Sequence, residues 1–218
     1  MDWTRVIDGY CERTDPSYWS EPINAVTNAA FMVAAVLMWV RCKGLHGGQV
    51  LAAILFAIGI GSFLFHTHAT AWAALADTTP ILMFVLAYIF LANRDFWGMR
   101  ALPAALLTAA YIPYSAALVP AFNLLPFFHI SSVYWPLPVL IFAYAFLLRA
   151  RTPETAKGLA IGAAILCLSL TARSLDETLC ESLPFGTHFL WHCLNALMLS
   201  WMIEVWRRHM LEAQATQG

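Results

Sequence analysis

The chain has 218 residues, of which 61% are hydrophobic and 11% are charged, with a net charge of −1 and a mean hydropathy of +0.66. Soluble domains carry about a quarter of charged residues, so this composition excludes an ordinary soluble enzyme and indicates several membrane-spanning helices. The near-neutral charge and the lack of a basic patch also exclude nucleic acid as a partner.

Charge-poor stretches follow one another along the chain and predict the membrane spans. A helix needs about 20 apolar residues to cross the hydrocarbon, and polar residues at the ends can extend the shorter stretches. The region 101–148 lacks charge over 48 residues, enough for two spans, and the polar, Pro-rich turn at 119–132 divides it. The predicted spans are residues 22–40, 50–65, 78–93, two within 101–148, 158–172 and 187–206. The sequence therefore predicts an all-α membrane protein with seven transmembrane helices.

The basic residues predict the orientation, because cytoplasmic loops of membrane proteins are enriched in Lys and Arg. With the N-terminus outside, nine of the twelve basic residues lie on the inner side, and only Arg5, Arg13 and Arg173 lie outside. We therefore expect an external N-terminus and a cytoplasmic C-terminus. The expected organisation is an extracytoplasmic acidic segment (1–21), a seven-helix membrane domain (22–207) and a short cytoplasmic tail (208–218).

Five polar residues fall near the outer ends of predicted helices. Ser62 and His66 lie near the outer end of the second helix, and Asp77 lies in the first turn of the third. His188 and His192 open the seventh helix four residues apart, so they share one face of it, one turn apart. Because the helices alternate in direction, we expect all five side chains to meet in one layer near the outer side.

This layer predicts a catalytic metal site. Ionisable groups inside a membrane are costly and indicate function, and catalytic zinc commonly takes three protein ligands, often His, with a fourth position for water. Asp77 could accept the proton of that water or orient it, and Ser62 could hydrogen-bond a developing oxyanion. The alternatives are histidines that only pack in the bundle, or a haem site, but the neighbouring Asp and Ser favour a hydrolytic metal. The remaining histidines, His46, His68, His129 and His209, are expected to be structural or surface residues.

Several motifs together resemble the alkaline ceramidases, seven-helix zinc amidases whose superfamily includes the adiponectin receptors. The motif GSFLFH at 61–66, Asp77 eleven residues after His66, and THFLWH at 187–192 match the family pattern. The N-terminal segment DGYCERTDPSYWSEPINAVTN (8–28) and LDETLCES (175–182) are similar to family segments as well. The resemblance covers essentially the full chain.

The resemblance implies roles for individual residues. It makes His66, His188 and His192 zinc ligands, with Asp77 and Ser62 acting on the water and on the reacting carbonyl. It also implies a disulfide between Cys11 and Cys180 and a calcium site in the acidic N-terminal segment, whose oxygen ligands suit that ion. The implied calcium ligands are Asp8, the Tyr10 carbonyl, Glu12, Asp15 and Glu21.

The calcium segment departs from the family pattern. One more residue separates its Asp from its Cys, and the family's Asn is replaced by Thr14 or Asp15, of which we take Asp15. Without the resemblance, this segment would be interpreted as a solvated acidic tail.

The expected function is zinc-dependent hydrolysis of the N-acyl bond of a ceramide-like membrane lipid, releasing a sphingoid base and a fatty acid on the extracytoplasmic side. One alternative is a hydrolase of another N-acyl lipid or of a lipid ester, which needs the same residues. Another is a non-enzymatic seven-helix receptor-like or transport protein with structural zinc. The short inner loops speak against a signalling receptor, and the sequence lacks the inverted repeat typical of transporters.

Overall fold

The computed structural model describes residues 2–7 and 9–215, and its regular secondary structure is helical. Within these residues, the β-pairing consists of an isolated bridge between Val6 and Thr70. The predicted all-α class is therefore confirmed. The α-helices are α1 (Pro22–Thr27), α2 (Ala29–Arg41), α3 (His46–His68), α4 (Ala71–Leu91), α5 (Ala101–Ala109), α6 (Tyr111–Asn123), α7 (Pro126–His129), α8 (Pro136–Leu148), α9 (Pro153–Leu175) and α10 (His188–Ala215).

Five helical segments of the described chain are long and apolar enough to cross a membrane. They are Pro22–Arg41, His46–His68, Ala71–Phe96, Ala101–Asn123 and Pro153–Leu175. Two further helices lie between or after them: α8 is apolar but has only 13 residues. In contrast, α10 has 28 residues but includes polar side chains such as Asn195 and Glu204.

Local signals explain where several helices begin and end. Proline occupies the first turn of α1, α7, α8 and α9, where its fixed φ suits a helix and its missing N–H costs nothing. Gly44 has a φ of +85°, which lets the chain turn back after α2. Ala69 ends α3 in the left-handed region, with a φ of +46°, and α4 follows after one further residue.

Three helices extend beyond the residues that the sequence assigned to the predicted spans. The third predicted span began at residue 78, but α4 begins at Ala71, because the segment 71–77 is rich in Ala and Leu, which favour helix. Asp77 therefore lies in the second turn of that helix. The predicted turn at 119–132 is narrower, since α6 continues to Asn123. The predicted tail from residue 208 is helical up to Ala215, as a continuation of α10.

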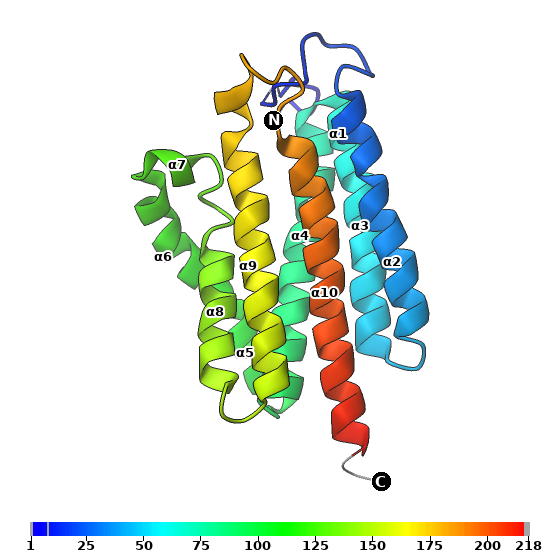
Figure 1. The fold of residues 1–218 in the computed structure, drawn as a ribbon, viewed down its shortest axis with the longest axis vertical. Helices are drawn as coiled ribbons and strands as arrows, with labels where there is room; N and C mark the ends of the chain where they lie inside the picture. Colours follow the sequence, from blue (N-terminus) through cyan, green and yellow to red (C-terminus); the bar gives the residue numbers. More distant parts are fainter. Residues whose placement is uncertain (1, 8, 216–218) are drawn as a thin grey trace.

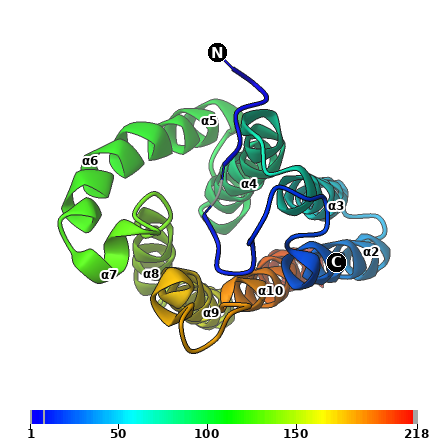
Figure 2. The same ribbon diagram turned by 90° about the horizontal axis from the view of Figure 1, so that it is seen from above.

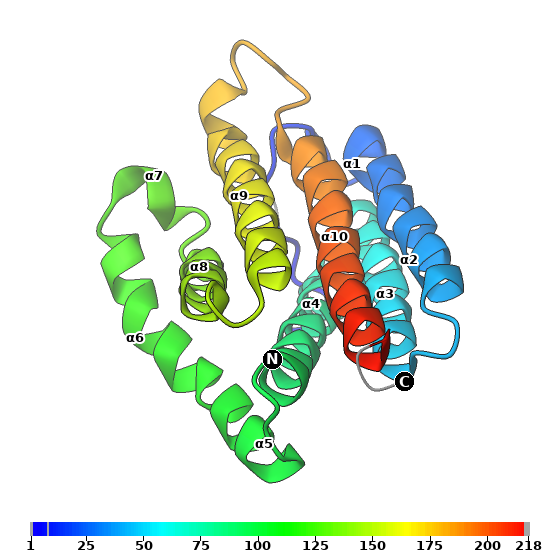
Figure 3. The same ribbon diagram turned by 60° about the horizontal axis from the view of Figure 1, so that its bottom comes forward.

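The helices form an upright bundle in which α10 lies between α9 and α2 (Figures 1 and 2). Close packing joins α3 with α4, α9 with α10, α2 with α3 and α8 with α9, and α10 also contacts α2. The N-terminal segment, α1 and the start of α10 lie at one end, which is the upper end in Figure 1. Seen from above and from the other end, α5, α6 and α7 form an arc on one side of the bundle (Figures 2 and 3).

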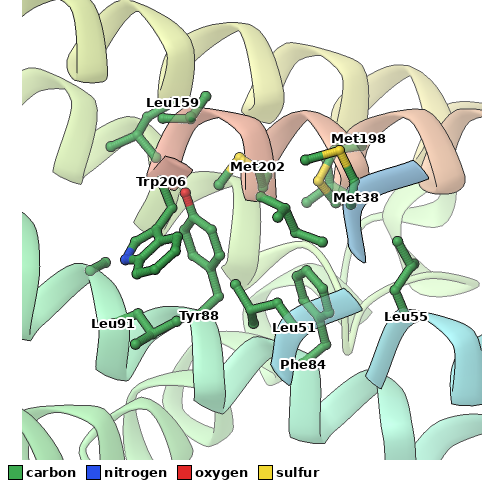
Figure 4. Packing of buried hydrophobic residues seen from close by; sticks show 14 of the residues in the cluster. Met38, Leu51, Leu55, Phe84, Tyr88, Leu91, Leu159, Met198, Met202 and Trp206 are labelled. Carbon is green, nitrogen blue, oxygen red and sulfur yellow. The ribbon is translucent and has the colours of Figure 1, made fainter. Parts of the chain in front are cut away.

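The apolar core fills the bundle below that upper end. Met38, Leu51, Tyr88 and Trp206 come from four different helices and belong to one cluster of buried hydrophobic side chains (Figure 4). Met198 and Met202 of α10 lie in the same cluster, where the flexible thioether side chains fill irregular gaps. The core therefore holds α10 in a fixed position between α2, α3 and α9.

Candidate metal and catalytic site

Three buried histidines meet at the upper end of the bundle. His66 lies in the last turn of α3, and His188 and His192 lie in the first two turns of α10. One ring nitrogen from each lies within 4.8 Å of those of the other two, and His192 is fully buried. Among the described residues, these histidines form the one group of three or more His, Cys, Asp or Glu side chains that could hold a metal ion.

Hydrogen bonds fix which ring nitrogens of His66 and His192 face the centre of the three-histidine group, the position that a metal ion would occupy. The Glu21 carboxylate lies 2.6 Å from Nδ1 of His66, and Oγ1 of Thr27 lies 2.9 Å from Nδ1 of His192. The Thr27 hydroxyl donates to the carbonyl of Ile23, so it accepts the N–H from His192. An ionised carboxylate also only accepts. Both Nδ1 atoms therefore carry a proton, and in the neutral form of each imidazole Nε2 presents a lone pair to the centre of the three-histidine group.

These two lone pairs fit a bound cation. The Nε2 atoms of His66 and His192 are 3.1 Å apart, and two nitrogens bound to one tetrahedral zinc at about 2.0–2.1 Å are roughly 3.3 Å apart. Two lone pairs at this distance repel each other unless a positive charge lies between them. A carboxylate or hydroxyl behind each imidazole is also the usual surrounding of a metal-bound histidine. The residues present fit zinc.

His188 is held by its backbone and by a neighbouring ring. Asp176 accepts the backbone N–H groups of Thr187 and His188 at 2.6 and 2.8 Å, which caps the start of α10. The Tyr10 ring stacks on the imidazole, with 3.7 Å between ring centroids. Nδ1 of His188 is buried without a hydrogen-bond partner. An orphaned buried nitrogen is costly, and His188 belongs to the one described group of histidines that could hold a metal ion.

Ser62 and Asp77 lie beside the histidines on adjacent helices. The side chains interact with each other across the α3–α4 contact, and both line one cavity. Gly61 makes this contact close: a Cβ atom there would lie 2.8 Å from the carbonyl carbon of Ala76 and 3.2 Å from Cα of Asp77. The missing side chain at Gly61 therefore brings the Asp77 backbone next to Ser62.

Two cavities meet at Asp77. The larger measures about 600 Å³ and is lined mostly by apolar side chains of α4, α6 and α10, with Ser62 and Asp77 among its few polar residues. The smaller, about 440 Å³, contains Tyr10, Arg173 and His188 and is more polar. Asp77, Tyr134 and Trp191 line both cavities. A molecule with a long apolar part and a polar part can therefore place its junction at Asp77.

The N-terminal segment covers the upper end of the site. It passes over the bundle between α3, α4, α9 and α10 (Figure 2). The Ile7 backbone N–H donates to the Ala69 carbonyl, and a disulfide joins Cys11 to Cys180, whose Cα atoms are 5.2 Å apart. The Cys11 backbone N–H also donates to Asp176, the residue that caps α10. These contacts place the Tyr10 ring directly on His188.

The described side chains expected to bind calcium have partners within the protein in this structure. Glu12 is largely buried and caps α1 by accepting the backbone N–H groups of Ile23 and Asn24 at 2.6 and 2.8 Å. Burial raises the pKa of Glu12. Asp15 is exposed and accepts the backbone N–H of Ser17. Asp8 lies outside the described residues.

Glu21 lies in the histidine site. Burial acts to raise its pKa, but the hydrogen bonds from His66 and Arg13 and the positive charge of Arg13 outweigh it, so the pKa of Glu21 is lowered. Glu21 is therefore a carboxylate that supports a histidine.

Comparison with known proteins decides the family. The family model Ceramidase matches residues 9–217. The chain belongs to the ceramidase family. The resemblance seen in the sequence motifs is thereby confirmed, and membership in the ceramidase family implies hydrolysis of the amide bond of ceramide. A comparison with curated proteins gave no match.

Sequence reasoning missed four residues that shape this ceramidase site. Thr27, Arg13, Arg173 and Asp176 touch its ligands, its cavities or the helix that carries two histidines. Asp176 carried a usable signal, since an Asp before a helix often caps it, although here it acts across a loop. Thr27 lies within a predicted span, and Arg13 and Arg173 entered the sequence analysis only through their charge, which predicts the membrane orientation. Their contacts depend on the fold and could not be predicted from the sequence.

Proposed function

We propose that this member of the ceramidase family is a zinc-dependent amidase that hydrolyses the N-acyl bond of a ceramide-like sphingolipid within the membrane. The products are a sphingoid base and a free fatty acid. The observation that carries the proposal is the pair of Nε2 lone pairs, 3.1 Å apart, beside Ser62 and Asp77 at the junction of two cavities.

His66, His188 and His192 would hold the zinc ion. When bound, the ion acts as a Lewis acid that polarises the amide carbonyl and lowers the pKa of a water molecule. Asp77 takes the proton from the attacking water and later returns it to the leaving amine nitrogen as general base and general acid. Ser62 donates its hydroxyl proton to the oxygen on which negative charge develops. Tyr10, stacked on His188, excludes bulk water from above.

The cavities fit the two parts of such a lipid. The larger cavity, at about 600 Å³, has the size and apolar lining of a ligand pocket and would receive hydrocarbon chain. The smaller cavity offers Arg173 and His129 to the hydroxyl groups of the sphingoid end. The scissile amide then lies beside Asp77, which lines both.

We further propose seven membrane spans, with α8 and α10 completing the five apolar segments. The excess of basic residues in the loops at the lower end in Figure 1 supports a cytoplasmic location of that end. The site, the N-terminal segment and the disulfide then lie on the extracytoplasmic side, where an oxidising environment permits the bridge.

The test uses detergent-purified protein and a fluorescent short-chain ceramide, with the released fatty acid measured by chromatography. We expect release by the wild type, and loss of release on zinc chelation or in Asp77→Asn. Asp2→Asn, which changes an exposed carboxylate that bonds Thr4, is the matched control and retains wild-type release. An N-acyl amine and a lipid ester are assayed in parallel. Faster hydrolysis of either one than of ceramide contradicts the proposed substrate, and equal release by Asp77→Asn contradicts the proposed mechanism.

A further inference from the structure

The acidic N-terminal segment does not fit a calcium ion in this structure. Calcium takes six to eight oxygen ligands at about 2.3–2.6 Å, and the expected ligands among the described residues are engaged elsewhere. The Tyr10 carbonyl accepts the Arg13 backbone N–H, the Glu12 carboxylate caps α1, and Asp15 bonds Ser17. Both carboxylate oxygens of Glu12 are used to cap α1, and both oxygens of Glu21 are used to bind Arg13 and His66.

The guanidinium of Arg13 lies between the Glu21 carboxylate and three backbone carbonyl oxygens. Nε of Arg13 lies 2.6 Å from Oε1 of Glu21, and the side chain of Arg13 is 3% exposed. Its two terminal nitrogens reach three backbone carbonyl oxygens. These are the carbonyls of Asp15 at 3.2 Å, Ser17 at 3.4 Å and His66 at 3.0 Å. One carboxylate and three carbonyls therefore surround a buried cation that belongs to the chain.

The arginine is connected to the histidine site through a single carboxylate. Glu21 binds Arg13 with Oε1 and Nδ1 of His66 with Oε2. Arg13 also binds the carbonyl of His66 itself. The planar guanidinium holds both groups at fixed angles, and unlike Lys or His it stays charged at every working pH. The orientation of the His66 ring therefore depends on Arg13, although Arg13 does not contact the centre.

We propose that Arg13 is a built-in cation that takes the place of a divalent ion in this segment and positions Glu21 and His66. Arg13 is thus a positioning residue, and this chain needs no calcium for stability or metal binding. The proposal concerns the N-terminal segment and is measured without any substrate, so it stands or falls separately from the proposed amidase reaction.

The first experiment measures thermal unfolding of the purified, zinc-loaded full chain with millimolar calcium, with magnesium, and with neither ion. We expect the same melting temperature in all three samples, because a ligand that does not bind the folded state cannot stabilise it. A calcium-specific rise in the melting temperature overturns the proposal. This measurement uses the wild type and does not depend on how any variant folds.

The second experiment measures zinc affinity by competition with a chromophoric chelator. For Arg13→Gln we expect zinc affinity to fall about 10–100-fold, the usual cost of losing an outer partner of a metal ligand. Arg13→Lys keeps the charge but not the fork of donors, and we expect an intermediate value. The matched control is Arg5→Gln, which removes an exposed positive charge from the same segment and leaves zinc affinity unchanged. Wild-type zinc affinity in Arg13→Gln overturns the positioning role.

Discussion

Replacing Gly61 with Ala perturbs the distance between the two proposed catalytic side chains without changing either of them. The added methyl carbon meets the α4 backbone at Ala76 and Asp77, and backbone cannot rotate aside as a side chain can. The methyl carbon would lie 2.8 Å from the Ala76 carbonyl carbon, whereas carbon atoms pack best at about 3.5–4.0 Å. The α4 helix must therefore move by about 1 Å near Asp77.

A displacement of this size has a calculable effect on catalysis. A shift of about 1 Å in a reacting group costs on the order of 100-fold in rate, which corresponds to about 2.7 kcal/mol of transition-state stabilisation. We expect kcat/KM for a fluorescent ceramide to fall by about that factor in Gly61→Ala. Zinc stoichiometry is expected to stay at the wild-type value, because the three histidines lie on α3 and α10 rather than on α4.

The matched control is Gly162→Ala, another glycine within a helix. There the new methyl group would meet the flexible Met202 thioether, which can move aside, and the position is remote from Asp77. We expect near-wild-type kcat/KM for this variant. Wild-type activity in Gly61→Ala would refute the argument that the close α3–α4 contact sets the catalytic geometry, and loss of zinc would show that the change acts through His66 instead.

Three further predictions concern the ligands and the disulfide. His192→Ala should abolish stoichiometric zinc, measured by elemental analysis, while a folded chain is verified by size-exclusion chromatography. Thr27→Val keeps the side-chain shape but removes the acceptor of the His192 N–H, and zinc affinity should fall about 10–100-fold in a chelator competition; an unchanged affinity would contradict the assigned tautomer. Cys180→Ser should lose about 2–5 kcal/mol of stability in thermal unfolding, whereas Cys193→Ser, at an exposed free cysteine, should not.

The sequence predicts the all-helical class and the end of the bundle at which the histidines lie, because both depend on patterns within single helices. Hydropathy locates the apolar segments, and the spacing of His188 and His192 places both on one face of α10. The ends of helices are harder to predict, because the position of a charged residue does not determine the residue at which a helix begins. For α4, the charge of Asp77 suggested a late start, but the preceding Ala-rich segment is helical.

The partners of the histidines could not be predicted, because they depend on the register between helices. Glu21 and His66 are 45 residues apart, and Thr27 and His192 are 165 apart. Nothing within either segment fixes how far one helix is shifted against another. The ion-binding role expected for Glu21 came from the family resemblance, and the guanidinium of Arg13 beside it becomes evident only when the chain is folded.

The disulfide and the position of α10 have a consequence for the order in which this protein matures. Cys11 is made early and Cys180 follows 169 residues later, and two of the three histidines belong to the last helix. A chain truncated before α10 already carries both cysteines of the bridge but holds one of the three histidines. The three-histidine site is therefore complete only after the last helix has been made, when both cysteines of the bridge are already present.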